Sequence, residues 1–222
     1  MMGYNACGMA VFTTEGIIVK RRNFGEADRL LTVVTPFKGK ITILAKGVRR
    51  ITSRRGGNVE LLNKVKLHVF QGQGMPILTE AEALETFPKI KNDLILSSYG
   101  SHIAELAERL LPENEPIPQG YNLLVVALTL LEKNPRQIFI RAFEVKLLTV
   151  LGFWSLDQVD ATQRIKDILQ QIQVKSWEEI ERLEVEPQEA LEVERILRYY
   201  IEKVLEAPLK SAKLIKELRI KN

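Results

Sequence analysis

Cysteine and histidine are scarce in this sequence. Its 222 residues contain one cysteine, Cys7, and two histidines, His68 and His102. A single cysteine cannot form an internal disulfide, and neither histidine has neighbours at the spacing of metal ligands. We therefore expect a cytoplasmic protein without a metal ion or another cofactor. We interpret Cys7 as an unimportant residue of a loose N-terminal extension, and both histidines as structural or surface residues.

Long apolar segments are missing as well. The longest mainly apolar run, residues 123–131, is far shorter than the roughly 20 residues that cross a bilayer. No Lys or Arg precedes the apolar patch at 6–12, so we predict neither a signal peptide nor a membrane partner. With 45% hydrophobic and 27% charged residues, the chain has the composition of an ordinary folded protein.

Signatures of catalysis are equally thin. The pair Gly39-Lys40 lacks the earlier glycine and the following Ser or Thr of a phosphate-binding loop. The glycines of segment 72–74 lead into a strand pattern, which favours a hairpin turn over a dinucleotide site. We interpret Glu26 and Asp28 as partners of neighbouring arginines. The sequence therefore predicts a protein that is not an enzyme.

Positive charge is present, and it is concentrated in the first 90 residues. These contain 14 Lys and Arg against 7 Asp and Glu, whereas the rest of the chain contains 18 against 21. Such a concentration predicts a polyanionic partner. The basic residues that we expect to contact it are Lys20, Arg21, Arg22, Arg29, Lys38, Lys40, Lys46, Arg49, Arg50, Arg54, Arg55, Lys64 and Lys66.

The hydrophobic pattern before Pro88 is that of short strands. We predict strands at 16–20, 30–35, 40–47, 59–70 and 75–86, separated by turn signals at 36–39, 56–58 and 72–76. In the fourth strand, apolar residues alternate with Lys64, Lys66 and His68, as in a strand with one wet face. Five short strands favour an OB-fold barrel over residues 14–88, preceded by an extension at 1–13.

After Pro88 the period changes to that of helices. Two sets of apolar residues each fall on one helical face, namely Tyr99, Ile103, Leu106 and Leu110, and Val193, Leu197, Tyr200 and Val204. Asn134-Pro135 predicts a helix start, Gly152 a helix end, and Ser176 with Glu179 a capping box. We expect five to seven helices over 89–222. The fold class is therefore an α+β two-domain protein, with an OB-fold barrel followed by an all-helical domain.

Several segments form a specific pattern. They are Phe24-Gly-Glu-Ala-Asp-Arg-Leu-Leu-Thr, Thr35-Pro-Phe-Lys-Gly-Lys, and Ala45-Lys-Gly-Val-Arg-Arg closed by Ser53-Arg54. In order and spacing they resemble the N-terminal signature of the RecO family of DNA repair proteins. The run Arg141-Ala-Phe-Glu-Val-Lys-Leu-Leu-Thr-Val-Leu-Gly-Phe is similar to the helix that precedes the family's zinc module. The resemblance covers residues 14–153 and fades afterwards.

The resemblance implies both a fold and a function. It implies an OB-fold followed by helices, binding of single- and double-stranded DNA, and annealing of complementary strands. It also implies two protein partners, the RecR ring and the acidic C-terminal tail of the single-stranded DNA-binding protein SSB. Together these proteins help to load the RecA recombinase in DNA repair and recombination.

One departure from the family pattern concerns zinc. Many relatives carry a four-cysteine zinc module directly after the position of Gly152 and Phe153. Here the chain continues from Trp154 without any cysteine, so we predict that the zinc module is absent. We expect residues 154–185 to close on themselves instead, through Trp154, Leu156 and Trp177.

The segment 46–55 is the main contact that we expect with DNA. A basic loop bounded by Gly and Ser follows a phosphate backbone without reading bases, and the strand face of Lys64, Lys66 and His68 extends it. The aromatic side chains available for stacking on bases are Phe24, Phe37 and Phe70. We interpret all three as interior residues of the barrel. The predicted grip is therefore electrostatic, and it leaves the base edges free for annealing.

The helical half contains a local group of basic residues near one helix start. We expect Arg136, Arg141 and Lys146 to bind the acidic tail of a partner protein where they border an apolar groove. Two other functions stay open. An OB-fold module for RNA or ribosomes would use the same basic loop, and competition with duplex RNA distinguishes it. A metal-dependent nucleic-acid enzyme would cleave labelled DNA in the presence of magnesium.

Overall fold

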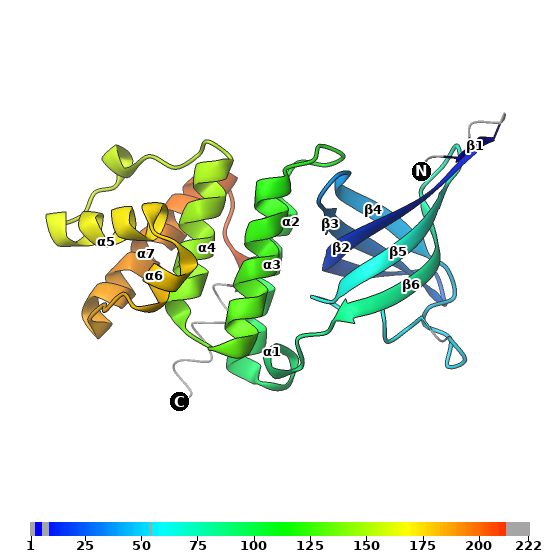
Figure 1. Cartoon of the computed structure of the whole chain (residues 1–222), viewed down its shortest axis with the longest axis horizontal. Coiled ribbons are helices and arrows are strands. Elements are labelled where there is room, and N and C mark those ends of the chain that lie inside the picture. Colours follow the sequence, from blue (N-terminus) through cyan, green and yellow to red (C-terminus); the bar gives the residue numbers. More distant parts are fainter. Residues whose placement is uncertain (1–2, 6–8, 54, 212–222) are drawn as a thin grey trace. The chain divides into compact units, whose positions relative to one another are not determined.

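Six strands and seven α-helices make up the described part of the chain. The computed structural model describes residues 3–5, 9–53 and 55–211, so Cys7 and Arg54 lie outside it (Figure 1). The strands are β1 (Gly3–Asn5), β2 (Met9–Phe24), β3 (Asp28–Thr35), β4 (Gly39–Ala45), β5 (Lys64–Gln71) and β6 (Ile77–Glu85). The helices are α1 (Pro88–Asn92), α2 (Leu94–Leu110), α3 (Pro118–Lys133), α4 (Gln137–Val150), α5 (Gln163–Val174), α6 (Trp177–Glu181) and α7 (Pro187–Leu205), with a 3-10 turn at Leu156–Gln158.

Strands β2 to β6 close into a five-stranded barrel. Hydrogen-bonded neighbours follow the order β2-β3-β4-β6-β5, and β5 pairs back with β2. The pairings are antiparallel except for β4 and β6, which meet in parallel at Leu44 and Ile77. This architecture confirms the predicted OB-fold. The alternation predicted for β5 is confirmed too, because Val65, Leu67 and Val69 are fully buried.

The barrel begins earlier in the chain than the sequence pattern predicts. Strand β2 starts at Met9 rather than at Gly16, and residues 10–17 pair with β5. The predicted extension at 1–13 is therefore too long. Polar Thr13, Thr14 and Glu15 interrupt the apolar pattern here, but threonine suits a strand because its branched side chain packs well on a pleated surface.

The chain divides into two compact units. The barrel unit comprises residues 1–88 and 107–125, and the helical unit comprises 89–106 and 126–222. The division falls inside helices α2 and α3, so the helical domain predicted at 89–222 is not a single unit. No helix in the described ranges is long and apolar enough to cross a membrane.

Helix α4 forms the centre of the helical unit. Its residues Phe139, Ile140, Phe143 and Leu147 are fully buried, and the helix packs against α5, α6 and α7. The capping box of Ser176 and Glu179 is confirmed at the start of α6. The other two predicted helix signals have different outcomes.

The helix end predicted at Gly152 is confirmed, because this residue has a φ of +75° directly after the C-cap of α4. The helix start predicted at Asn134 is wrong. Helix α4 begins at Gln137 with Arg136 as the N-cap. The Asn134 side chain instead donates a hydrogen bond to Glu181, so it is not available to cap the helix.

Candidate nucleic-acid interface

The turn between β2 and β3 is bound to the loop that follows β4. The Asp28 carboxylate accepts a hydrogen bond from the backbone N–H of Gly47 at 2.7 Å. In return, Arg49 donates from its backbone N–H to the Ala27 carbonyl at 3.0 Å and from its guanidinium to the Gly25 carbonyl at 3.2 Å. Two segments that are distant in sequence therefore form one surface at this end of the barrel.

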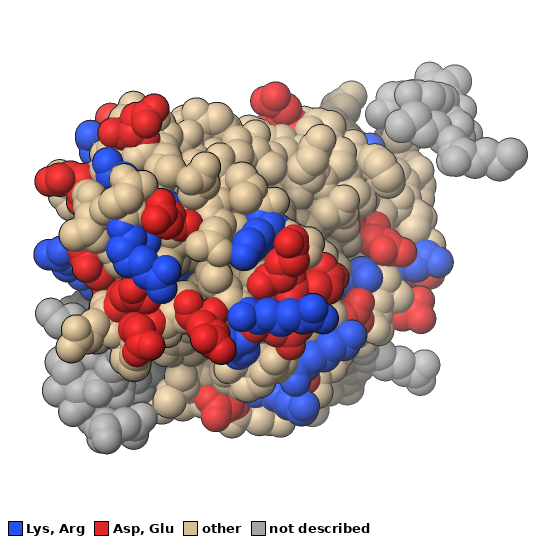
Figure 2. All heavy atoms as spheres, turned by 60° about the vertical axis from the view of Figure 1, so that its left-hand side comes forward, with Lys and Arg blue, Asp and Glu red and all other residues tan. Residues whose placement is uncertain are grey.

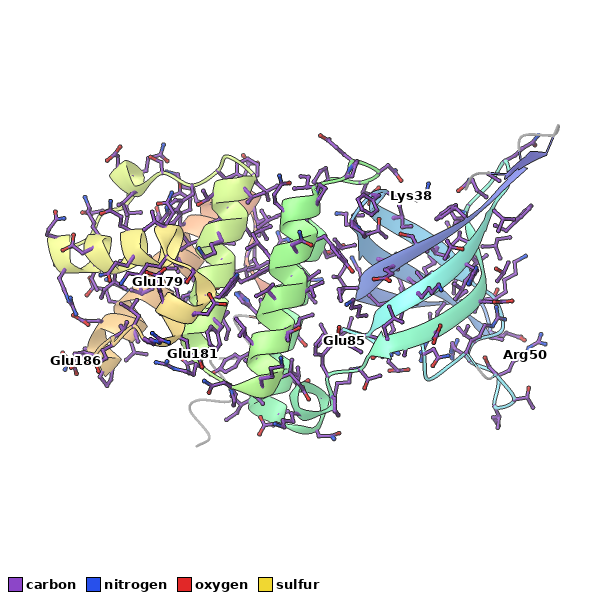
Figure 3. All side chains as sticks on the ribbon, viewed as in Figure 1. Lys38, Arg50, Glu85, Glu179, Glu181 and Glu186 are labelled. Carbon is purple, nitrogen blue, oxygen red and sulfur yellow. The ribbon has the colours of Figure 1, made fainter. Side chains whose placement is uncertain are left out.

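This surface carries four exposed cations and an exposed aromatic ring. We call it the basic tip, and it consists of Arg22, Phe24, Lys46, Arg49 and Arg50. Figure 3 shows the Arg50 side chain pointing away from the strands. In the described part of the chain, Arg22, Lys46 and Arg50 have no ion-pair partner. Their charges are therefore available to an external anion.

The exposed Phe24 corrects a prediction made from the sequence. Phe24 and Phe37 are 49% and 79% exposed, although the sequence analysis placed them in the barrel interior. Both lie at hairpin turns, where the chain leaves the sheet and few neighbours remain to cover a side chain. The adjacent Gly25 is the sequence feature that could have placed Phe24 at a turn. Its φ of +57° is a backbone conformation that favours glycine.

Arg55 belongs to the same loop but has a different role. Its guanidinium donates hydrogen bonds to the carbonyls of Leu78, Thr79 and Lys46, each at 3.0 Å. Asn58 adds a hydrogen bond to the Ala81 carbonyl. These contacts attach the loop to β6, whose edge pairs with β4 at a single position. Arg55 therefore holds the loop in place, and three of its N–H donors are used within the protein.

Arg21 and Arg29 share an acidic partner on the barrel. Arg21 Nη1 lies 2.5 Å from one oxygen of Glu60, and Arg29 Nη1 lies 3.3 Å from the other. The side chains of both arginines are about one quarter exposed. The sequence predicts both arginines as DNA contacts but gives no sign of Glu60.

Lys40 was predicted to contact DNA, and its position in the structure argues against that role. Its side chain is buried and donates a hydrogen bond to the Glu108 carbonyl in the last turn of α2. Burial lowers the pKa of Lys40, while the nearby carboxylates of Glu108 and Glu113 oppose this shift. Lys20 forms an ion pair with the Glu108 carboxylate at 2.7 Å. Both lysines therefore serve contacts within the barrel unit.

Lys38, Lys64 and Lys66 lie away from the basic tip. Lys38 lies over the ring of Phe12, and Figure 3 shows it on a different side of the barrel from Arg50. Lys64 pairs with Glu85 at 2.9 Å. Lys66 stands between Glu15 and Glu82 on the neighbouring strands. The predicted basic strand face is therefore mixed in charge.

Of the described Lys and Arg residues that were predicted to bind DNA, the structure brings only some together. The structure gathers Arg22, Lys46, Arg49 and Arg50, with the Glu60-bound pair Arg21 and Arg29 nearby on the same hairpin. It separates or buries Lys20, Lys38, Lys40, Lys64 and Lys66, and it engages Arg55. Arg54 lies outside the described residues.

The helical unit contains a pocket of about 230 Å³ next to the start of α4. Its wall combines the arginines Arg136 and Arg141 with apolar side chains from α4, α5, α7 and the segment after α6, including Ile138, Ile168, Leu183, Val185 and Val193. An apolar hollow with cations at its border matches the predicted groove. Elsewhere basic and acidic side chains are interspersed, as Figure 2 shows on its visible face.

Two of the three basic residues predicted near this groove have internal partners. Arg141 is 7% exposed and pairs with Glu144, which also accepts a hydrogen bond from buried His102 at 2.6 Å. Lys146 donates to the backbone carbonyls of Gln173 and Lys175 at the end of α5. Burial lowers the pKa of Lys146. Arg136 alone of these three is left to contact a partner.

The region after α4 offers no set of zinc ligands. In the described ranges no group of three or more His, Cys, Asp or Glu is arranged to hold a metal ion. Trp154 packs against Tyr200 of α7, with ring centroids 5.0 Å apart, and donates to Gln173 of α5. The segment therefore packs against other helices through Trp154, whereas the sequence predicted closure with Trp177, which packs near Phe139.

Comparisons with known proteins agree with the fold. The N-terminal and C-terminal family models of recombination protein O match residues 9–87 and 91–158. The DNA repair protein RecO of Symbiobacterium thermophilum is 34% identical over 148 residues. That of Acetivibrio thermocellus is 35% identical over 148 residues, and that of Listeria monocytogenes 29% over 141.

These similarities cover part of each protein. The matches span 65% of this chain for the first two relatives and 63% for the third. They span 58%, 59% and 55% of the relatives themselves. The two family models together contain strands β2 to β6 and helices α2 to α4.

Proposed function

The chain belongs to the RecO family of DNA repair proteins, and from this premise we propose that its barrel binds DNA through the basic tip. We further propose that the protein anneals complementary strands and assists the loading of RecA together with RecR. A general role in DNA repair and recombination follows from the family. The finer activities are inferences, supported by the arrangement of charge on the barrel.

The single observation that carries the proposal is the pairing of two basic segments at one end of the barrel. Three backbone and side-chain hydrogen bonds fix the loop 46–50 against the β2–β3 turn. Because the cations of the tip are exposed and unpaired by carboxylates, binding DNA replaces contacts with water and counterions only. Release of condensed counterions then drives association.

The chemistry of the tip suits annealing. Lys and Arg contact phosphates, which all DNA sequences share, so binding is independent of sequence. Screening of phosphate repulsion brings two strands together, while base edges that the protein does not cover stay free to pair. Phe24 adds one ring on which an unpaired base can stack. We infer a preference for single strands from this ring.

The pocket beside Arg136 suits the acidic, apolar-ended tail of SSB. Its apolar wall would take the terminal side chains, and Arg136 would attract the acidic ones. Fluorescence polarisation of a labelled tail peptide tests this proposal. Arg136→Glu should weaken binding at least tenfold, whereas Lys133→Glu, an exposed residue on the preceding helix, should change it by about twofold or less.

An annealing assay tests the main function. Complementary strands coated with SSB are mixed with the wild-type protein or with the triple variant K46A/R49A/R50A. The wild type should accelerate annealing, and the variant should lose most of the acceleration while staying folded, with a small drop in melting temperature from the lost Arg49–Gly25 hydrogen bond. Equal annealing by the two proteins would contradict the proposal. We also propose that the protein is not an enzyme, so labelled DNA should stay intact with magnesium.

A further inference from the structure

We propose that Arg21 and Arg29 form a phosphate-binding site for nucleic acid that Glu60 occupies in the unbound protein. The proposal rests on the proposed DNA binding and adds a regulated subsite to it. The Glu60 carboxylate acts as an internal competitor, which a DNA phosphate has to displace.

The geometry is that of one anion held between two guanidinium groups. Each carboxylate oxygen of Glu60 faces a different arginine, at 2.5 Å from Arg21 and 3.3 Å from Arg29. A phosphate group also presents separate oxygens to two donors, and arginine is the side chain best suited to it. One carboxylate neutralises one of the two cations, so the cluster keeps a net positive charge.

The two arginines converge because of strand register. Asn23 of β2 lies opposite Arg29 of β3, and Arg21 lies opposite Leu31. Residues two apart on a strand point to the same face, so Arg21 and Arg29 share one face of the hairpin. The opposite face carries Arg22 and Phe24 of the basic tip. The Glu60 site therefore lies within one or two residue pairs of the tip along the hairpin but on its other face, so a strand bound at both has to pass around the hairpin.

The backbone around Glu60 fixes its position. Ile18 donates to the Asn63 carbonyl at 3.1 Å and accepts from the N–H of Leu62 at 2.8 Å. These bonds lie next to the shift in strand register of β2 between Ile18 and Lys20. Leu62 has a φ of +68°, a conformation that costs free energy for a bulky side chain. The loop is thus held in a strained form that presents Glu60 to the arginines.

The site is partly accessible from solvent, although Arg21 Nη1 itself is buried. The Glu60 side chain is 41% exposed, and those of Arg21 and Arg29 are 25% and 24% exposed. An ion pair with this degree of exposure contributes little free energy, so an incoming phosphate can replace the carboxylate at low cost. A fully buried pair would not exchange in this way.

The experiment compares Glu60→Gln with Glu115→Gln, a matched control that removes the same charge from an exposed position of the barrel unit beside the β3–β4 turn, away from the basic tip. Binding of a labelled single-stranded oligonucleotide is measured over a series of salt concentrations. E60Q should bind about fivefold tighter at low salt. Its salt slope should be steeper by about 0.7 to 1.4, which corresponds to one or two added phosphate contacts. E115Q should change affinity by about twofold or less with an unchanged slope.

Melting temperature in inorganic phosphate provides an independent measurement. Without Glu60 the two guanidinium groups repel each other, so phosphate should raise the melting temperature of E60Q above that in chloride of equal ionic strength. The wild type and the double variant E60Q/R21A should show only the smaller rise that phosphate gives to folded proteins in general. Folding of E60Q in phosphate but not in chloride would also support the site.

Two results would overturn the inference. The first is equal salt slopes for E60Q and E115Q, and the second is an E60Q chain that phosphate stabilises no more than it stabilises the wild type, including one unfolded in both salts. Absence of DNA binding by the wild type would instead contradict the proposed function, and the phosphate measurement would still test the Glu60 site. The failure of one proposal is therefore distinguishable from the failure of the other.

Discussion

Arg50 and Arg55 lie five residues apart on one loop and have opposite surroundings. Arg50 is exposed and points away from the strands, whereas the guanidinium of Arg55 is bound to three backbone carbonyls. Residue type and position in the sequence do not distinguish them. Only the fold shows which guanidinium is free for a phosphate.

Substitution of these two arginines should affect different properties. Arg50→Ala should weaken binding to DNA about three- to tenfold, the scale of one lost phosphate contact, with an unchanged melting temperature. Arg55→Ala should lower the free energy of unfolding by about 1 to 3 kcal/mol, because it leaves carbonyls without donors. Fluorescence anisotropy and urea unfolding measure the two effects. Arg195→Ala, on the exposed side of α7, is the control and should change neither.

Phe24→Ala should affect the binding of single-stranded DNA and of duplex DNA differently. Loss of a stacking ring should weaken single-strand binding by about 1 kcal/mol or more and leave duplex binding nearly unchanged, since paired bases are not available for stacking. Phe37→Ala is the matched control, because this ring is exposed at the opposite end of β3. Equal effects of F24A on both DNA forms would exclude stacking at the tip.

The ionisation of Tyr121 should make the stability of the barrel depend on pH. Burial raises the pKa of Tyr121 to about 12, and Glu15 and Glu85 add to this shift. Between pH 10 and 12 the tyrosine ionises in the unfolded chain but not in the folded one. The free energy of unfolding should therefore fall over this range by up to about 2 to 3 kcal/mol.

Tyr121→Phe isolates this contribution. The hydroxyl has no hydrogen-bond partner among the described residues, so the variant should be as stable as the wild type at pH 7, or more stable by about 1 kcal/mol. Above pH 10 the difference in favour of the variant should grow. Urea unfolding at pH 7 and pH 11 measures both. A difference that shrinks with pH would show that the phenol ionises readily in the folded barrel.

At the scale of elements, the turn between β3 and β4 fits closely against the segment after α2. Gly39 has a φ of +68°, and a Cβ there would lie 2.3 Å from the Glu115 carbonyl oxygen. Asn114 donates its N–H to the Lys40 carbonyl next to this point. Glycine is therefore required both by backbone conformation and by space.

Gly39→Ala should destabilise the barrel by about 2 kcal/mol or more, because the new methyl group meets backbone atoms that cannot rotate away. Gly74→Ala is the control, since a Cβ at Gly74 meets no atom within 4 Å. Thermal unfolding of both variants tests the prediction. Equal melting temperatures would mean that the segment 113–115 does not pack against the turn as described.

The sequence predicts best those elements that have a regular local pattern of residues. The alternation in β5 and the capping box of α6 depend on residues within one segment, so local patterns suffice to locate them. The early start of β2 could not be predicted, because Thr13 and Thr14 become strand residues only through pairing with β5. Likewise, Asn134 resembles a cap, but its contact with Glu181 comes from a distant helix.

The candidate site was predictable only in part, for a similar reason. Clustering of cations in sequence identified the loop that carries Lys46, Arg49 and Arg50. It could not show that Glu60 lies between Arg21 and Arg29, because that contact depends on strand register and on a loop more than 30 residues away. Net charge thus identifies the class of partner, and the fold identifies which cations reach it.

At the scale of the whole molecule, we propose that the barrel unit binds DNA and the helical unit binds the acidic peptide. The two sets of cations belong to different compact units of the chain. Variants of the basic tip should therefore leave peptide binding unchanged, and Arg136→Glu should leave DNA affinity unchanged.

The salt dependence of DNA binding is the most direct test of whether the cations of the basic tip contact DNA phosphates. Affinity for a single-stranded oligonucleotide is measured from low to moderate salt for the wild type and for K46A/R49A/R50A. The logarithm of affinity should fall linearly with that of salt, and the triple variant should have a slope shallower by about 2, since each phosphate contact contributes about 0.7. Identical slopes for the two proteins would contradict the assignment of DNA to the basic tip.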